Sequence, residues 1–408
     1  MQQIKKFEYI YLSVLLLPAA IVSGPFVSDL IISLIAIYFL ATKHEQIKIF
    51  FKKYFFLKVL FIFCITNIII SLFSENVFVS LKNSLTYIRF PIFLIALSFF
   101  FKKNFKYMDI LYYSIFFTVL IVCYDACLQF FTGKSIMGFI SNSRYRVSGF
   151  FRDEYILGSF LARMTPILIA IFYIFKEKKI RTSIILLCIL SYLTIIFSGE
   201  RTSTGIITIF YLLFFIFVIN FSFKNKIYLS MIIIFSFIFI IFSSYALKTR
   251  FLSTTQDQLT AIFNDKEKLD VGKYNNQHMK HLLVSYEMFK KKPVFGYGNK
   301  MFQEVCYNEF YKDDGRCSTH PHNFTAQIAV ENGIVGLFFY AILFGYFVLS
   351  FFKHNKKGNE SLSVITLSII VFLSPIFPSG SFYNNLMSIF LYFPIAIHFI
   401  LLERSNEK

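Results

Sequence analysis

The 408-residue chain contains no tryptophan, and its 23 acidic residues are far outnumbered by 41 Lys and Arg. Several motifs of soluble enzymes are also missing: a Gly-rich phosphate loop, a Walker-type Lys, His-Glu-x-x-His and Gly-x-Ser-x-Gly. Their absence argues against ATP-driven chemistry. The lack of Trp beside 57 Phe and 25 Tyr indicates a compositional bias, from which we infer no function, although Tyr can occupy the membrane interface.

Apolar residues dominate what is present. They make up 56% of the chain, the mean hydropathy is +0.63, and they form long blocks separated by short charged patches. Blocks of this length are typical of membrane spans. We therefore predict an all-α polytopic membrane protein with about twelve transmembrane helices. The expected spans lie near residues 8–23, 26–42, 55–73, 84–101, 108–132, 156–175, 182–198, 203–222, 227–246, 333–352, 361–377 and 384–402.

The basic residues define the topology. They fall on every second connection between spans, and loops rich in Lys and Arg remain in the cytoplasm. We expect both termini in the cytoplasm and the long hydrophilic segment on the opposite face. The net charge of +18 thus marks loops, and no nucleic-acid partner is expected. The first apolar block lacks a clear cleavage site and continues through Ser23-Gly24-Pro25, so we expect it to be retained.

This topology divides the chain into three parts. Residues 1–246 hold spans 1 to 9, residues 247–332 form one large, partly helical exported loop, and residues 333–408 hold spans 10 to 12 and the cytoplasmic tail. Within the loop, residues 277–292 predict an amphipathic helix that ends at Pro293. Its expected apolar face contains Leu282, Leu283, Tyr286 and Phe289.

Two of the six cysteines lie in the exported loop, while the other four lie in predicted spans and are interpreted as small buried apolar residues. Cys306 and Cys317 could be free thiols or a disulfide. We favour the disulfide, because an exported loop meets an oxidising compartment and a bridge would hold the histidine-bearing strand in place.

Arg201 is the clearest polar candidate. It follows Ser198-Gly199-Glu200 between two apolar runs, where an unpaired guanidinium near the hydrocarbon costs about 2.5 kcal/mol or more. It could pair with Glu200 or extend to the interface. We favour a lipid phosphate, because the planar fork of Arg can donate two hydrogen bonds to it.

A second group of arginines precedes the sixth span, in a connection where the positive-inside rule predicts few of them. It contains Arg144, Arg146 and Arg152. We select Arg146 as an anion ligand. Arg152 can instead pair with a neighbouring acid, and such pairs contribute little; Arg163 is a weaker candidate.

Four histidines form the third candidate group. His320 and His322 flank Pro321 in the exported loop, while His278 and His281 lie on the amphipathic helix. Imidazoles can bind zinc, but no carboxylate or thiolate lies at a fixed spacing, so no metal is expected. Two surface histidines are the plainer alternative. We favour a general base, with Pro321 restricting the turn and Asn323 capping the helix that follows.

These motifs carry a resemblance to a known family. Ser198-Gly-Glu-Arg201, the turn Pro293-Val-Phe-Gly296-Tyr-Gly298, and His322-Asn323 followed by Gly333-x-x-Gly336 resemble, in this order, the signature of the O-antigen ligase and polymerase superfamily of bacterial membrane glycosyltransferases. The number of spans and the position of the exported loop are also similar, so the resemblance covers most of the chain.

The resemblance implies an O-antigen ligase of the bacterial inner membrane. Its donor would be a glycan on undecaprenyl diphosphate, and its acceptor would be the lipid A core of lipopolysaccharide in the periplasmic leaflet. The transfer would invert the sugar and need no cofactor. His322 would be the base, and Arg201 would hold the diphosphate.

The resemblance also implies supporting roles on both substrates. Arg146 would assist on the donor side, and His320 would orient His322 beside Asn323. The family usually places a further arginine near the amphipathic helix, where this chain departs from the pattern. His278, or else Arg250, is the second phosphate ligand that we expect.

Three alternatives remain. A polymerase would use the same donor and a carrier-linked acceptor, and a protein O-oligosaccharyltransferase would glycosylate Ser or Thr. The Cys-x-Thr-His-Pro-His-Asn form, and a chain that ends after its last span, favour the ligase. A transporter or flippase would carry ionisable groups near mid-bilayer and repeated halves. Here Asp125 is the main acid inside a span and no repeat is evident, which favours an enzyme acting on lipid-linked substrates.

Overall fold

The protein is described from a computed structural model that covers residues 2–141, 146–175, 178–253, 255–256, 277–310 and 317–407. In these ranges the secondary structure is helical apart from one isolated β-bridge between Lys134 and Ile140. The predicted all-α class is confirmed, and the chain is a multi-pass membrane protein. The part of the chain described has nine helices long and apolar enough to span a membrane, or ten if one bent pair counts as a span.

The predicted count of twelve spans is not reached in the described residues. One of the expected blocks, 361–377, forms an apolar helix of 13 residues, Glu360–Phe372, that is too short to cross a bilayer by length alone. A helix rises about 1.5 Å per residue, so a helix of this length cannot cross a hydrocarbon core of about 30 Å unaided. The bent pair, Glu45–Lys53 with Phe55–Ser71, turns by 115° at its break.

The helices follow one another along the chain. They are α1 (Gln2–Ser23), α2 (Pro25–Lys43), α3 (Glu45–Lys53), α4 (Phe55–Ser71), α5 (Val77–Tyr87), α6 (Arg89–Lys103), α7 (Tyr107–Thr132), η1 (Gly149–Phe151), α8 (Leu157–Phe175), α9 (Lys178–Phe197), α10 (Arg201–Leu213), η2 (Phe214–Val218), α11 (Phe223–Ser243), α12 (Tyr245–Lys248), η3 (Thr249–Ser253), α14 (Gln277–Lys291), α15 (Phe302–Val305), η5 (Cys306–Phe310), α16 (Phe324–Lys356), α17 (Glu360–Phe372) and α18 (Asn385–Glu407).

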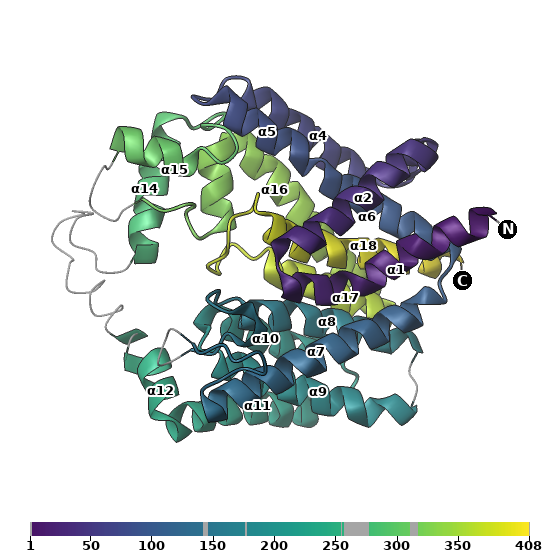
Figure 1. Ribbon diagram of the computed structural model, residues 1–408, viewed down its shortest axis with the longest axis vertical. Coiled ribbons are helices and arrows are strands. Elements are labelled where there is room, and N and C mark those ends of the chain that lie inside the picture. Colours follow the sequence, from purple (N-terminus) through teal and green to yellow (C-terminus); the bar gives the residue numbers. More distant parts are fainter. Residues whose placement is uncertain are drawn as a thin grey trace.

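Two central helices join two groups of spans. In Figure 1, α17 and α18 lie between an upper group, which includes α2, α4 and α6, and a lower group formed by α7 to α11. The contacts agree with this view, since α18 packs on α6 and α17 packs on α8 and α16. The two termini lie near each other, on the side opposite to α12, α14 and α15.

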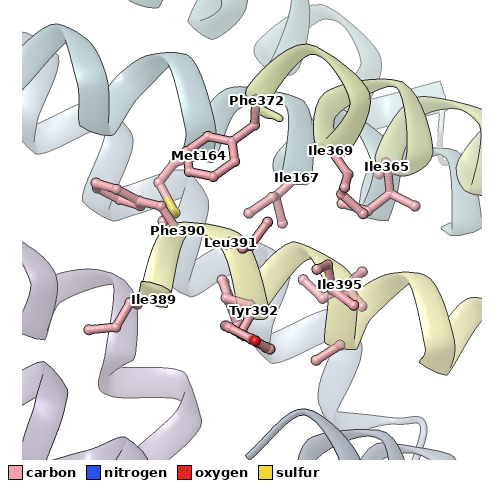
Figure 2. Close-up of a cluster of buried hydrophobic side chains, with 14 of the residues drawn as sticks. Met164, Ile167, Ile365, Ile369, Phe372, Ile389, Phe390, Leu391, Tyr392 and Ile395 are labelled. Carbon is pink, nitrogen blue, oxygen red and sulfur yellow. The ribbon is translucent and has the colours of Figure 1, made fainter. Parts of the chain in front are cut away.

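The centre of the bundle is filled by interlocking side chains. Figure 2 shows Met164 and Ile167 of α8 facing Ile369 and Phe372 of α17 and Phe390 of α18. In lipid there is little hydrophobic gain from bringing helices together, so close packing of this kind holds the helices in place.

Helix α16 begins at Phe324, nine residues before the expected span start at 333. Asn323 caps it, since its side-chain oxygen accepts a hydrogen bond from the Ala326 amide at 3.0 Å. Within the helix, Gly333 has φ 64° and ψ −159°, a conformation that kinks the axis and that essentially only glycine adopts.

The turn that follows α14 packs against the kink at Gly333. The Ile334 amide donates to the Pro293 carbonyl at 2.8 Å, and the Gly298 amide donates to the Glu331 carbonyl at 2.8 Å. A Cβ on Gly333 would collide with the Val294 carbonyl. The two backbones therefore touch, and α14 is fixed relative to the first turns of α16.

A second, smaller core supports this junction. It joins α14, the turn, α15 and α16, and contains Val284, Met288, Tyr297, Met301, Phe302, Val305, Cys306, Cys317 and Val330. The predicted helix at α14 is present, but its predicted apolar face is wrong. Leu282 and Tyr286 are exposed, whereas His281, Val284, Ser285 and Met288 are buried. The buried stripe is therefore turned toward the histidines.

Buried amides also link this junction to the transmembrane helices. The Asn332 side chain donates to Asn67 of α4 at 2.9 Å and to Asn299 at 2.8 Å, and it accepts from the Tyr383 hydroxyl at 2.6 Å. Because all of these groups are buried and bonded to one another, the network specifies one arrangement of the four segments.

Gly333→Ala should lower the free energy of unfolding by about 1–3 kcal/mol, since alanine cannot adopt this conformation without strain. Gly345→Ala is the matched control in the same helix. A Cβ there meets nothing within 4 Å, so this substitution should be neutral or stabilising by up to about 1 kcal/mol. Thermal unfolding of both variants in detergent tests the kink, and equal behaviour would contradict it.

Candidate functional site

Four imidazoles converge on one point. His322 lies in the turn before α16 with φ 57°, and its carbonyl accepts a hydrogen bond from the Ser379 amide at 2.8 Å. The centre of its ring is 4.1 Å from that of His320, 5.2 Å from His278 and 5.4 Å from His281. The structure thus brings two sequence-distant pairs of histidines into one cluster around His322.

Helix α14 supplies two members of this cluster. His278 and His281 are three residues apart, so they lie on the same side of the helix, and α14 packs against α16. His281 is buried, whereas part of the His278 surface stays accessible. The buried stripe of α14 that contains His281 is therefore the stripe that faces His322.

Burial and crowding keep the His320 and His322 imidazoles neutral. Burial, and then the neighbouring imidazoles, lower the pKa of His322 to about 3. Burial is also the largest cause that lowers the pKa of His320, to about 4. Near pH 7 both rings are therefore neutral and each has a nitrogen able to accept a proton. Among the residues that the structure describes, no three His, Cys, Asp or Glu side chains are arranged to hold a metal ion.

A disulfide fixes the strand that leads into the histidines. Cys306 and Cys317 are bonded, with their Cα atoms 5.7 Å apart and a separation of 11 positions in the sequence. Both are buried in the smaller core. A bridge closing a loop of this size stabilises a fold by about 2–4 kcal/mol, mainly by restricting the unfolded chain. It limits how far His320 can move from the core.

Three arginines form the second part of the site. Arg201 is the first residue of α10 and donates to the Thr255 hydroxyl at 2.9 Å. Arg250 donates to the Gly199 carbonyl at 3.2 Å, and the Arg146 guanidinium lies 3.9 Å from the centre of the Tyr155 ring.

The arginines share one electrostatic environment. Burial is the main cause that lowers the pKa of Arg146; the negative charge of Glu200 raises it, and the positive charges of Arg250 and Arg201 lower it. Arg201 also contributes to lowering the pKa of His278, after burial and His281. The charge of Arg201 therefore acts on the His278 imidazole.

Glu200 does not neutralise this group by capturing Arg201. Its carboxylate accepts hydrogen bonds from the Gly158 amide at 2.7 Å, the Ser159 amide at 3.0 Å and the Ser203 hydroxyl at 2.9 Å. These amides belong to the first turn of α8, where a negative charge is favourable. Burial raises the pKa of Glu200 despite those bonds. The acid therefore holds α8 and α10 together, and the nearby guanidinium groups can receive an external anion.

Two polar residues of α7, for which sequence analysis proposed no role in the site, position Arg146. Asp125 accepts a hydrogen bond from the Ile136 amide at 2.6 Å, and Gln129 accepts from the Ser148 amide at 3.0 Å and the Gly149 amide at 2.7 Å. Their four-residue spacing in an apolar span was the signal that could have identified them. They fix the connection that carries Arg146.

The remaining candidate residues from the sequence lie at several different places in the structure. Asn323 bonds through its amide nitrogen to the Pro375 carbonyl at 2.7 Å and thereby fixes the turn of His322. Arg152 lies over the Phe139 ring at 4.9 Å, and Arg163 is buried in α8. Arg144 lies outside the described residues.

Comparison with known families gives one match. Residues 185–341 match the family model described as O-Antigen ligase. The matched region runs from α9 into α16 and so includes Arg201, Arg250 and all four clustered histidines, whereas Arg146 precedes it. Members of this family are lipid-linked glycan transferases, so the expectation of an enzyme is confirmed. A comparison with curated proteins finds no match.

His320→Gln should reduce the pH dependence of stability. An unfolded imidazole has a pKa near 6.5 and binds a proton as the pH falls, whereas folded His320 does not until about pH 4. Each such group therefore destabilises the wild type by up to about 2 kcal/mol at pH 5. Unfolding measured at pH 7 and pH 5 should show a smaller loss in His320→Gln than in the wild type. The exposed His44→Gln serves as control and should behave as the wild type.

Proposed function

We propose that this chain, a member of the O-antigen ligase and polymerase family through residues 185–341, is an O-antigen ligase. It would transfer a glycan from undecaprenyl diphosphate to a hydroxyl of the lipid A core of lipopolysaccharide. The observation that carries this proposal is the neutral His322 imidazole, whose neighbour His278 lies within the electrostatic influence of Arg201, one of a group of three arginines. The first supplies a proton acceptor, and the second supplies a binding site for a diphosphate.

His322 acts as the general base in this reaction. The acceptor hydroxyl loses its proton to the imidazole as its oxygen bonds to the anomeric carbon of the donor. On the opposite face of that carbon, the bond to the diphosphate oxygen breaks, so the configuration inverts. The bound diphosphate supplies negative charge near the cluster, which favours the protonated imidazole and raises its pKa from the low value of the free site.

The arginines bind the donor and stabilise the leaving group. As the glycosidic bond breaks, negative charge increases on the diphosphate, and preorganised cations stabilise that charge without reorganising. Arg201 is the central ligand because it begins α10 two residues after Gly199, whose carbonyl accepts a hydrogen bond from Arg250. The contacts favour Arg250 over His278 as the second phosphate ligand, since His278 lies among the imidazoles. Arg146 assists from the connection held by α7.

The remaining histidines and Asn323 position His322. His320 and His281 enclose its ring, and Asn323 fixes the turn on the segment after α17. We further propose that both termini lie in the cytoplasm and that the site faces the periplasm, where both lipid-linked substrates would meet. The alternation of basic loops supports this orientation.

His322→Gln should reduce glycan transfer by at least about 10²-fold, since a positioned base contributes about 10²–10⁴. The measurement is transfer from a lipid-linked donor to lipid A core by purified protein. His44→Gln replaces an exposed histidine far from this cluster in sequence and should retain activity. Retained activity in His322→Gln would exclude it as the base.

Arg201→Lys should reduce transfer by tenfold or more, because a lost charge-assisted hydrogen bond is worth about 1.5–3 kcal/mol and Lys lacks the planar fork. Arg181→Lys makes the same change at an exposed position of α9 and should have no effect. Full activity of Arg201→Lys would show that Arg201 does not bind the diphosphate through two bonds.

A lipid inventory after gene deletion distinguishes a ligase from a polymerase. Loss of a ligase should cause long carrier-linked chains to accumulate while the core remains uncapped. Single repeat units on the core would instead indicate a polymerase, and a normal profile with an unglycosylated protein would indicate a protein O-oligosaccharyltransferase.

A further inference from the structure

An exposed apolar turn lies beside the span formed by α16. Val294 and Phe295 follow α14 and are 48% and 57% exposed. On α16, Ile334 and Phe338 are 58% and 62% exposed, and their four-residue spacing places them on one side of the helix. Because α16 is long and apolar enough to cross a membrane, an exposed apolar side of this helix faces lipid. The turn adds two large apolar side chains next to that surface.

Hydrogen bonds fix the depth of this turn. The Pro293 carbonyl accepts from the Ile334 amide at 2.8 Å, and the Val294 carbonyl accepts from the Val335 amide at 3.3 Å. The next charged residue along α16 is Lys353, nineteen residues after Ile334, which corresponds to about 28 Å along the helix axis. The hydrocarbon core of a bilayer is about 30 Å thick. With Lys353 at one boundary of the hydrocarbon, the turn therefore lies at the other.

The backbone of the turn is prepared for apolar surroundings. Backbone groups at hydrocarbon depth need protein partners, because lipid offers none. The kink at Gly333 leaves amides of α16 free to bond with the Pro293 and Val294 carbonyls, and proline itself has no amide hydrogen. The Tyr297 amide donates to the Val330 carbonyl at 3.0 Å. Irregular backbone is tolerated at this depth because α16 satisfies it.

A second span begins at the same level. The Lys292 ammonium lies 3.0 Å from the Glu75 carboxylate, and Glu75 lies two residues before Val77, where another candidate span starts. Lys290 is exposed at the end of α14, with its ammonium 4.4 Å from the centre of the Tyr286 ring. Lysines at a membrane boundary bury their hydrocarbon stems and keep their charge among the headgroups. Apolar tip and basic neighbours together match the two layers of a bilayer surface.

We propose that the turn Pro293–Phe295 is a membrane anchor, in which Val294 and Phe295 enter the edge of the hydrocarbon and Lys290 contacts phospholipid headgroups. This proposal rests on the membrane spans and not on the proposed chemistry. Its consequence for the site is positional. The anchor holds α14 at the bilayer surface, so the histidines of α14 lie at headgroup depth, where a lipid-borne substrate carries its polar part.

The test is the depth of a nitroxide attached at Phe295→Cys, in nanodiscs of phosphatidylglycerol and phosphatidylcholine. Depth is measured by collision with oxygen, which partitions into lipid, and with a water-soluble nickel chelate. Phe338→Cys on α16 is the lipid reference, and Glu154→Cys, at an exposed acid before α8, is the water reference. The Phe295→Cys label should favour oxygen, as at Phe338→Cys. Labelled wild type gives the background from the native thiols.

Two results would overturn the anchor. Preferential collision with the nickel chelate, as at Glu154→Cys, would place the turn in water. Low collision with both probes, together with spin–spin broadening between copies, would show that a second copy of the chain covers the turn. Val294→Cys repeats the measurement at the neighbouring position, so the test remains decisive even where Phe295→Cys does not elute as folded protein.

Lys290→Glu tests the headgroup contact. It should raise collision of the Phe295→Cys label with the nickel chelate about twofold, because anionic headgroups attract a lysine and repel a carboxylate. Lys248→Glu on α12 is the matched control, since Lys248 is also exposed and its ammonium also lies over a ring, 5.8 Å from the centre of Phe242. The control should leave the label unchanged. No change in Lys290→Glu, or an equal change in both variants, would remove Lys290 from the anchor.

Discussion

The backbone contact between the turn after α14 and the kink of α16 is the constraint on which the histidine cluster depends. Hydrogen bonds from Ile334 to Pro293 and from Gly298 to Glu331 join two segments that contribute different histidines. Gly333 permits the approach because any side chain there would meet the Val294 carbonyl. Without this junction, His278 and His281 would have no fixed position relative to His322.

The membrane setting gives each buried polar group a stringent requirement for a partner. Asn332 meets it through other amides, and Glu200 meets it through the amides that begin α8. The consequence at the site is electrostatic. Because Glu200 is bonded to the start of α8, it does not capture Arg201, which donates to the Thr255 hydroxyl instead.

The sequence predicted the helical class and most of the helix positions, because long apolar blocks have few alternatives in a bilayer. The sequence was less accurate about where helices begin and end and about which face of a helix is buried, because the length of an apolar block does not determine these. Glu360–Phe372 proved too short to cross a membrane unaided, and α16 began at Phe324. The apolar face of α14 was also wrong, since its buried stripe includes His281 and Ser285. Periodicity cannot show that a polar residue will be the one turned inward.

The sequence by itself determined which chemical groups are present, namely the imidazoles of the exported loop and the arginines at the ends of spans, and it determined the match of residues 185–341 to one family model. The tertiary structure alone decided which of these meet. His278 and His322 are far apart in the chain, and so are Arg146, Arg201 and Arg250. Their proximity depends on packing between helices and on hydrogen bonds made by Asp125, Gln129 and Asn323. Such contacts arise from the folded arrangement of many residues, so no local pattern in the sequence encodes them.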